Sequence, residues 1–189
     1  MPRPKRFTIN EYLTIERKAE TKSEYCDGMI LAMAGGLPDH NFIGTNIAAA
    51  LWHRLRAAGS SRVINSDQRV AVAQGEALYY PDVTVVCGDL KMFGRNRDVI
   101  ANPILVVEVL SRSITGYDRL VKVPQYQRTP SMADILLVSQ DKARVEHLTR
   151  IGKTGKWKTT THASISAIVE LPSIACSLPL ADVYLNIDL

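Results

Sequence analysis

The chain contains little cysteine. Its three cysteines, Cys26, Cys87 and Cys176, are far apart, odd in number, and form no Cys-x-x-Cys pair. This spacing argues against a disulfide framework and against a zinc ribbon. We therefore interpret the three as small buried apolar residues, and we expect the protein to work in a reducing cytoplasm.

Long apolar segments are also missing. No run approaches the roughly 20 apolar residues of a membrane-spanning helix. The basic start, Met-Pro-Arg-Pro-Lys-Arg, is not followed by the apolar core of a signal peptide. We therefore expect no membrane contact and a cytoplasmic location.

Several classes of enzyme lack their sequence marks here. Aromatic residues make up 6% of the chain, which is few for the sugar-stacking surfaces of a glycosidase, although Asp82 and Glu108 could supply its two carboxylates. Ser111 and Ser113 lie in no Gly-x-Ser-x-Gly motif, and no histidine partner is evident. No glycine-rich phosphate-binding motif is present either. These absences argue against a glycosidase, a serine hydrolase and a P-loop enzyme.

The composition is that of an ordinary globular protein. The chain has 189 residues, 46% of them hydrophobic, with neither an internal repeat nor a linker rich in Gly, Ser or Pro. This length predicts one domain over residues 1–189, large enough for a full core. The formal charge of +4 fits a phosphate-bearing partner without requiring one.

The spacing of apolar and turn residues predicts alternating helices and strands. A capping box from Thr8 to Glu11 indicates a first helix ending near Lys18, and Asp27-Gly28 indicates a tight hairpin at residues 25–34. Apolar residues at helical spacing predict a long helix over residues 39–58, ended by Gly59. The other predicted elements are strands at residues 62–65, 68–73, 78–87, 104–111 and 135–139, a helix at 118–128, and a second hairpin from 144–150 and 157–161. This order predicts an α/β (or α+β) fold with a mixed sheet and helices packed on it.

Two acidic residues are out of place in this pattern. Glu108 lies within the apolar strand Ile-Leu-Val-Val-Glu-Val-Leu, and Asp82 follows Pro81 in another apolar run. A buried carboxylate costs free energy unless it is paired or binds a metal. One interpretation is that each acid pairs with an arginine. The other is that the two share a hard cation, Mg²⁺ or Mn²⁺, which prefers oxygen ligands.

These residues also resemble a known family. Pro81-Asp82 followed by Glu108 resembles the PD-(D/E)xK nuclease superfamily, and the chain is similar to its Uma-type branch of restriction-endonuclease-like proteins over residues 7–184. The motifs that carry this resemblance are Glu24-Tyr25-Cys26-Asp27-Gly28, Met33-Ala34-Gly35-Gly36 with His40-Asn41, Tyr80-Pro81-Asp82-Val83, Ala101-Asn102-Pro103, Val106-Val107-Glu108-Val109-Leu110-Ser111, Tyr117-Asp118-Arg119 with Lys122 and Tyr126, Val138-Ser139-Gln140-Asp141, Val145-Glu146-His147, and Leu171-Pro172-Ser173-Ile174.

The resemblance implies a restriction-endonuclease-like mixed sheet flanked by helices, with an N-terminal helix-hairpin and a C-terminal hairpin. It also implies metal-dependent phosphodiester cleavage in DNA. Asp82 and Glu108 would be the Mg²⁺ or Mn²⁺ ligands, with the main-chain carbonyl of Val109 as a third. Glu24 would add an acid from the first-helix region, and His40 would contact a phosphate or brace an acid.

The motif is broken at its lysine. Two residues after Glu108 the superfamily has lysine, but this chain has Leu110. The resemblance implies that Lys122, in the following helix, replaces it. The alternative is that Lys122 forms an i, i+4 pair with Asp118 on a solvated helix face. Pro124 would interrupt a helix already under way, unless the helix begins so late that Pro124 lies in its first turn.

Basic residues are spread around these motifs. We expect Arg95, Arg97, Arg112 and Arg119 to contact a nucleic-acid backbone. Residues 91–97 join the two motif strands, so we expect this loop to lie near the site. A homodimer would let paired sites cut both chains of a duplex. The rival hypothesis is a degenerate nuclease fold that binds nucleic acid or a protein partner without cutting.

Overall fold

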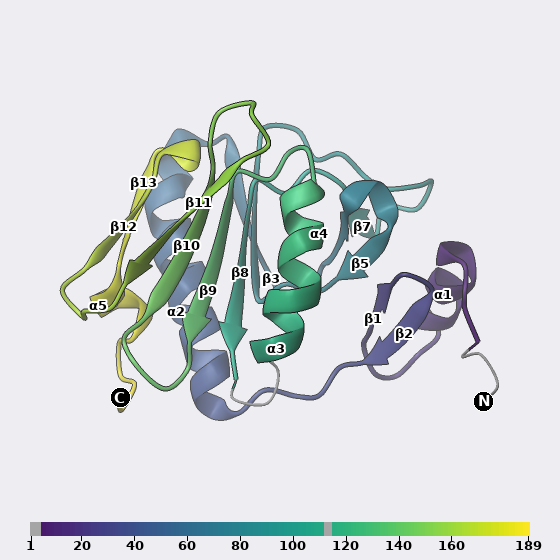
Figure 1. Cartoon of the computed structure of the whole chain (residues 1–189), viewed down its shortest axis with the longest axis horizontal. Helices are drawn as coiled ribbons and strands as arrows, with labels where there is room; N and C mark the ends of the chain where they lie inside the picture. Colours follow the sequence, from purple (N-terminus) through teal and green to yellow (C-terminus); the bar gives the residue numbers. More distant parts are fainter. Residues whose placement is uncertain (1–4, 112–114) are drawn as a thin grey trace.

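The computed structural model describes residues 5–111 and 115–189, which form a mixed α+β fold with three sheets (Figure 1). The helical elements are α1 (Ile9–Glu16), α2 (Pro38–Leu55), the 3₁₀ turns η1 (Arg56–Ala58), η2 (Ala73–Gly75) and η4 (Pro172–Ile174), α3 (Thr115–Tyr117), the π-helical segment η3 (Asp118–Lys122), α4 (Val123–Arg128) and α5 (Leu180–Val183). The strands are β1 (Ser23–Cys26), β2 (Met29–Ala32), β3 (Ser61–Asn65), β4 (Arg69–Val72), β5 (Ala77–Tyr79), β6 (Val83–Cys87), β7 (Val99–Ile100), β8 (Leu105–Leu110), β9 (Asp134–Ser139), β10 (Val145–Arg150), β11 (Trp157–His162), β12 (Ile168–Leu171) and β13 (Cys176–Pro179).

The largest sheet has six strands in the order β11-β10-β9-β8-β6-β3. Only β8 and β9 pair in parallel within it; the other four pairings are antiparallel. The chain reaches β9 from β8 through α3, η3 and α4, as a parallel pairing requires a crossover. This crossover carries the residues from Asp118 to Tyr126 across one face of the sheet (Figure 1).

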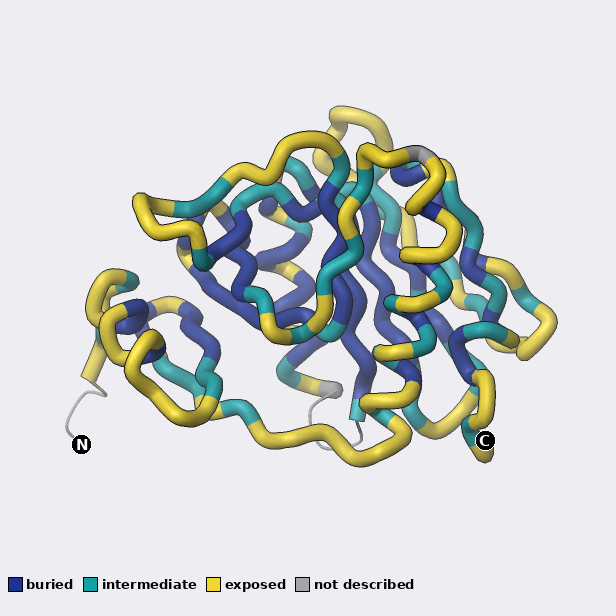
Figure 2. Tube along the Cα trace, turned by 180° about the vertical axis from the view of Figure 1, so that it is seen from behind, coloured by how far each residue is buried: buried dark blue, intermediate teal, exposed yellow. Residues whose placement is uncertain are grey.

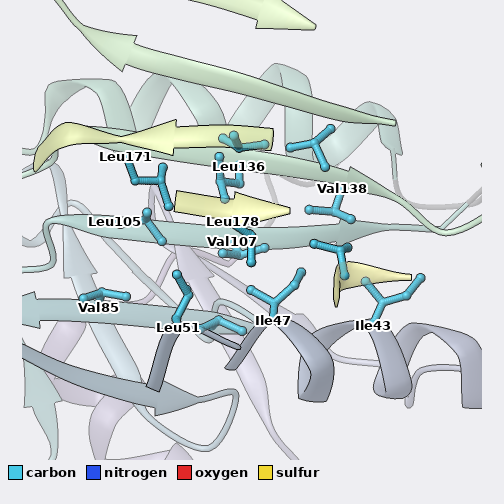
Figure 3. Packing of buried hydrophobic residues seen from close by; sticks show 14 of the residues in the cluster. Ile43, Ile47, Leu51, Val85, Leu105, Val107, Leu136, Val138, Leu171 and Leu178 are labelled. Carbon is cyan, nitrogen blue, oxygen red and sulfur yellow. The ribbon is translucent and has the colours of Figure 1, made fainter. Parts of the chain in front are cut away.

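The two faces of this sheet bury different cores. On one face, Ile43, Ile47 and Leu51 of α2 pack against alternate residues of β8, as Figure 3 shows for Leu105 and Val107. On the other face, Val106 and Leu110 pack with Val123 and Tyr126 of the crossover. The strands are therefore buried on both sides, which explains their nearly continuous apolar sequences, and Figure 2 shows the buried residues concentrated in them.

The second sheet has five strands in the order β2-β1-β5-β4-β7, and the third is the hairpin β12-β13. Helix α1 begins with the predicted capping box, in which Glu11 N–H donates to Thr8 Oγ1 and Thr8 N–H donates to Glu11 Oε2. The predicted Asp27-Gly28 hairpin joins β1 and β2, and Gly59 ends the long helical region with a φ of 65°.

The prediction of one strand over residues 78–87 is wrong. The run divides into β5 and β6, which belong to different sheets. Its centre, Tyr80-Pro81-Asp82, is outside both strands because proline has no N–H to donate to a sheet ladder. The chain therefore changes sheet at this point, and Asp82 lies directly at the start of β6.

Strand β7, the β12-β13 hairpin and helix α5 are elements that the sequence pattern did not predict. These elements are two to four residues long, too short for a periodic pattern to stand out. The hairpin packs its Val169, Leu171 and Leu178 into the core on the α2 face. Tertiary packing, more than local sequence, therefore stabilises it.

Candidate active site

Asp82 and Glu108 lie close together at one end of two neighbouring strands. Val83 pairs with Val107 in antiparallel register, so Asp82, directly before Val83, lies beside the end of β8 that carries Glu108. The Val109 N–H donates to Asp82 Oδ2 over 2.7 Å. Glu108 is 4% exposed. The structure thus brings the two acids together, as sharing a cation requires.

Glu108 points to the face that the crossover covers. The Tyr126 hydroxyl donates to Glu108 Oε1, and Lys122 Nζ lies 3.3 Å from the same oxygen. Leu110 lies two residues farther along β8 and packs into the core beside Tyr126. Lys122, from the following helix, thus places an ammonium group beside Glu108, which Leu110 of β8 cannot do.

Lys122 lies among three carboxylates. Its Nζ is 2.8 Å from Glu24 Oε1, 3.3 Å from Glu108 Oε1 and 3.6 Å from Asp118 Oδ1. The residue is 5% exposed, so the pair with Asp118 exists but is not on a solvated helix face. Burial alone would lower the pKa of Lys122, but the three acids outweigh burial and raise the pKa above its usual value. Lys122 is therefore a protonated, hydrogen-bond-donating group.

The helix that carries Lys122 accommodates Pro124 by a change of helical type. Residues Asp118–Lys122 are π-helical, with the Val123 N–H bonded to the Asp118 carbonyl, and Pro124 lies in the first turn of α4. In that turn the missing N–H of proline costs little. The helix therefore continues through Pro124, and Lys122 is the residue at which its two parts meet. Single π-helical turns occur frequently at functional sites.

Glu24 reaches the site from the second sheet. It lies in β1 and not in the first-helix region, so that expectation was wrong. The Tyr80 N–H donates to Glu24 Oε1 over 3.2 Å. Burial, the largest influence, raises the pKa of Glu24 above its usual range, although Lys122 opposes the shift. The hairpin thus adds a buried acid to Lys122 from outside the six-stranded sheet.

His40 lies on the other side of Asp82. Its Nε2 is 3.5 Å from Asp82 Oδ2, and burial lowers its pKa below the usual value, which favours the neutral ring. His40, Asn41, Gly44 and Asp82 line part of a cavity of about 310 Å³ between α2 and β3. This cavity gives solvent a path to Asp82.

The sequence analysis gave Asp118 and Tyr126 no role in the site. Both are buried and contact Lys122 or Glu108 directly. Their spacing was the available signal, since residues 118, 122 and 126 recur every four positions, which places side chains on one helix face. Only the fold shows that this face covers Glu108.

The four predicted arginines have different positions. Arg95 and Arg97 are exposed, but their loop follows the end of β6 that is opposite Asp82, about 17 Å away for five strand residues. The expectation that residues 91–97 hang near the site is therefore wrong. Arg119 is close to the site and forms a two-pronged ion pair with Glu146. Arg112 lies outside the described residues.

Comparison with known proteins identifies the family. Residues 9–181 match the model of the Uma2 family, described as "putative restriction endonuclease". The chain belongs to this family. Two uncharacterized proteins of Synechocystis are relatives: one is 32% identical over 87% of this chain and 92% of its own length, the other 33% identical over 97% and 93%.

A solved structure shares the Uma2 fold. It is a crystal structure from Anabaena variabilis described as a "putative nuclease belonging to DUF820". It matches with a TM-score of 0.77 and 18% identity, over 94% of this chain and 97% of the other. The predicted restriction-endonuclease-like fold is therefore confirmed. In the described part of this Uma2 chain, no helix is long and apolar enough to cross a membrane.

The charge of this Uma2 site favours a cation. Asp82, Glu24, Glu108 and Asp118 surround one positive group, Lys122. Burial, then the charge of Glu108, raises the pKa of both Asp82 and Asp118 to about 7. Their oxygen atoms are ligands of the type that Mg²⁺ and Mn²⁺ prefer. Among residues 5–111 and 115–189 no three His, Cys, Asp or Glu residues are grouped for metal binding.

Proposed function

We propose that the protein is a Mg²⁺- or Mn²⁺-dependent nuclease that hydrolyses phosphodiester bonds of DNA. The observation that carries this proposal is the side-by-side placement of Asp82 and Glu108, with Lys122 Nζ 3.3 Å from Glu108. Two carboxylates and a lysine in one buried site are the groups that metal-assisted phosphodiester hydrolysis uses. Membership of the Uma2 family supports the same chemistry.

Each residue has a separate task in this proposal. Asp82 and Glu108 would hold the ion, with the Val109 carbonyl beside them; a bound divalent ion supplies a more acidic water and charge neutralisation at the phosphate. Lys122 would orient the attacking water or stabilise negative charge on the phosphate, because a lysine with a raised pKa donates protons in hydrogen bonds and does not accept them.

Two further residues position these groups. Tyr126 donates to Glu108 Oε1 and so fixes its carboxylate, while Glu24 holds Lys122 Nζ at 2.8 Å. His40, favoured as a neutral ring, would brace Asp82 from the side of the cavity. The cavity beside His40 and Asp82 would admit the nucleic acid.

Cleavage of supercoiled plasmid tests this proposal. Wild type is compared with Asp82→Ala and Glu108→Ala, in Mg²⁺, in Mn²⁺ and with a chelator. We expect nicking only with metal and none by either variant. Asp89→Ala, which removes an exposed acid after β6, is the matched control and should nick like wild type. Equal activity of wild type and both site variants would refute the proposal.

One observation favours a second candidate function, a degenerate nuclease fold that binds nucleic acid or a protein partner without cutting. Lys122 is held by three carboxylates and is far from free to meet a phosphate. Calorimetric titration with Mn²⁺ separates the two functions. The nuclease binds Mn²⁺ and loses it on Asp82→Asn. The degenerate module binds none, and Asp82→Asn leaves its nucleic-acid binding intact or stronger.

The compartment and the oligomeric state of the protein are also part of the proposal. All three cysteines are free thiols, which suits a reducing cytoplasm. We also propose a homodimer, because one site cuts one chain of a duplex at a time. Sedimentation equilibrium gives the oligomeric state; a monomer that still makes double-chain breaks in a single encounter would contradict the dimer.

A further inference from the structure

A second cavity adjoins the site on the β10 side. It has a volume of about 450 Å³, and its lining includes Leu110, the basic Arg119, Lys142 and Arg144, and the acidic Asp141 and Glu146. Leu110 is two residues beyond Glu108 on β8, so the cavity opens about 7 Å along the strand from that acid.

The sheet register places this cavity on the same face as Glu108. Glu108 pairs with Leu137, and Leu137 pairs with Glu146. The three residues therefore form a row across β8, β9 and β10, with side chains on one face and about 10 Å between the outer two. Arg119 reaches Glu146 from the crossover, three residues before Lys122. The same helical segment thus contributes Lys122 to the candidate active site and Arg119 to this cavity.

Glu146 fixes two guanidinium groups at this cavity. Arg119 Nη2 donates to its Oε1 over 3.0 Å and Arg119 Nη1 to its Oε2, while Arg144 Nε and Nη2 donate to Oε1 over 3.2 and 3.0 Å. The Glu146 side chain is 14% exposed, whereas those of Arg119 and Arg144 are 37% and 38% exposed. The arginines therefore keep accessible donors, and the acid holds them in place before any ligand arrives. Preorganised guanidinium groups are well suited to phosphate.

We infer that Arg119, Lys142 and Arg144 bind a phosphate of the nucleic acid next to the phosphate that is cut. The inference rests on the proposed function and adds a subsite to it. A nucleic acid that places one phosphate at Asp82, Glu108 and Lys122 has a neighbouring phosphate within reach of a cationic cavity about 10 Å across the sheet. In this arrangement Glu146 orients the arginines and also limits their net charge.

Two variants that change the charge of the cavity in opposite directions, Arg144→Gln and Glu146→Gln, test this subsite. Binding of a short fluorescent DNA duplex is measured by anisotropy in chelator, so that nothing is cut, from about 50 to about 200 mM salt. Arg144→Gln should weaken binding about tenfold and lower the slope of log affinity against log salt by about 1, the change expected for one lost phosphate contact. Glu146→Gln should strengthen binding, because the amide oxygen can still accept from the guanidinium groups and orient them, while the negative charge that opposes the phosphate is removed.

The matched control is Arg128→Gln. Arg128 also pairs with a glutamate, Glu76, but at the far end of α4 and on the surface, so its loss should leave affinity and salt slope unchanged. Arg144→Lys keeps the charge without the planar fork and should retain the salt slope. Thermal unfolding of each variant verifies folding. If Arg144→Gln binds like wild type, or Glu146→Gln binds more weakly while folded, the inference is overturned.

A further binding comparison distinguishes an internal phosphodiester from a terminal phosphate as the group bound in the cavity. If the cavity holds an internal phosphodiester, duplexes with and without a terminal 5′-phosphate should bind with equal affinity. A preference for the terminal phosphate that Arg144→Gln abolishes would overturn the assignment of an internal phosphodiester.

Plasmid cleavage is measured as a separate experiment. Normal nicking with an unchanged salt slope in Arg144→Gln refutes only the subsite, whereas loss of metal-dependent nicking in wild type refutes the proposed function.

Discussion

At the scale of single residues, the site carries more negative charge than its surroundings can balance. Asp82, Glu24, Glu108 and Asp118 lie around Lys122 in a mostly buried space. A buried charge costs several kcal/mol unless it is paired. Protonation of these acids or a bound cation would therefore stabilise the site.

The first prediction concerns the pH dependence that Asp82 imposes. Its pKa is raised from 3.8 to about 7 in the folded protein, so the folded state holds a proton that the unfolded chain has already lost. This contribution to stability is complete below about pH 4 and is lost as the pH rises through about 7. Asp82→Asn, which can still accept from the Val109 N–H, should raise the free energy of unfolding by about 2 kcal/mol at pH 8. Urea unfolding at pH 8 and at pH 4 measures this, and an equal effect at both would contradict it.

The second prediction concerns Lys122. Lys122→Met removes the ammonium group that touches Glu24, Glu108 and Asp118. We expect it to lower the free energy of unfolding by about 3 kcal/mol at pH 8, because buried acids lose their partner. The loss should shrink toward pH 5 as the acids bind protons. Adding Glu24→Gln should restore part of the stability, and a double variant no more stable than Lys122→Met would count against this account.

At the scale of elements, short segments hold the site in place. The β1-β2 hairpin carries Glu24, the break at Pro81 carries Asp82, and the π-helical turn carries Lys122. None of these elements is long enough to be stable alone. Their geometry depends on turn residues that permit unusual backbone angles and on packing against the six-stranded sheet.

The third prediction tests the hairpin turn. Gly28 has a φ of 84°, and a Cβ there would lie 3.1 Å from the Cβ of Arg6. Gly28→Ala should therefore lower the free energy of unfolding by about 1–2 kcal/mol. Gly116→Ala is the control, because Gly116 lies in α3 with no atom within 4 Å of its added Cβ; it should be neutral or stabilise by up to about 1 kcal/mol. Chemical denaturation compares the two, and equal effects would show that the turn does not require glycine.

At the scale of the whole molecule, the site joins two sheets and a crossover. Glu24 comes from the five-stranded sheet, Glu108 from the six-stranded sheet, and Lys122 from the segment that crosses its face. A cation held there would link these parts. Under the proposed function, folding stability and metal affinity would therefore be coupled, since a ligand that binds only the folded state stabilises it.

The fourth prediction follows from this coupling. Mn²⁺ at about 100 times its Kd should stabilise the protein by about 2.7 kcal/mol, which raises Tm by roughly 5–10 °C for a chain of this size. The rise should be larger at pH 8 than at pH 6, because Asp82 must lose its proton to bind the ion. Differential scanning calorimetry measures it. Asp82→Asn should abolish the rise, and an equal rise in that variant would place the ion elsewhere.

Residue patterns along the chain were enough to predict the mixed fold and to single out the two carboxylates. Long periodic or apolar segments became α2, β8 and β9, because burial of a continuous face is a strong local signal. Glu108 and Asp82 were recognisable because a charged residue in an apolar run costs free energy unless it is paired or binds a metal. Short elements such as β12 and β13 gave no comparable signal, since their stability comes from the core that they cover.

The assembly of the site, in contrast, depends on how the elements pack together. Leu110 shows that the strand lacks its lysine, but no spacing along the chain reveals that Lys122 reaches Glu108, because this depends on how a π-helical turn lies across the sheet. The strand register likewise places Glu146 in one row with Glu108. The direction of β6 places the loop of residues 91–97 after the strand end that is opposite Asp82. Distances between elements are set by packing and register, and a linear pattern contains neither.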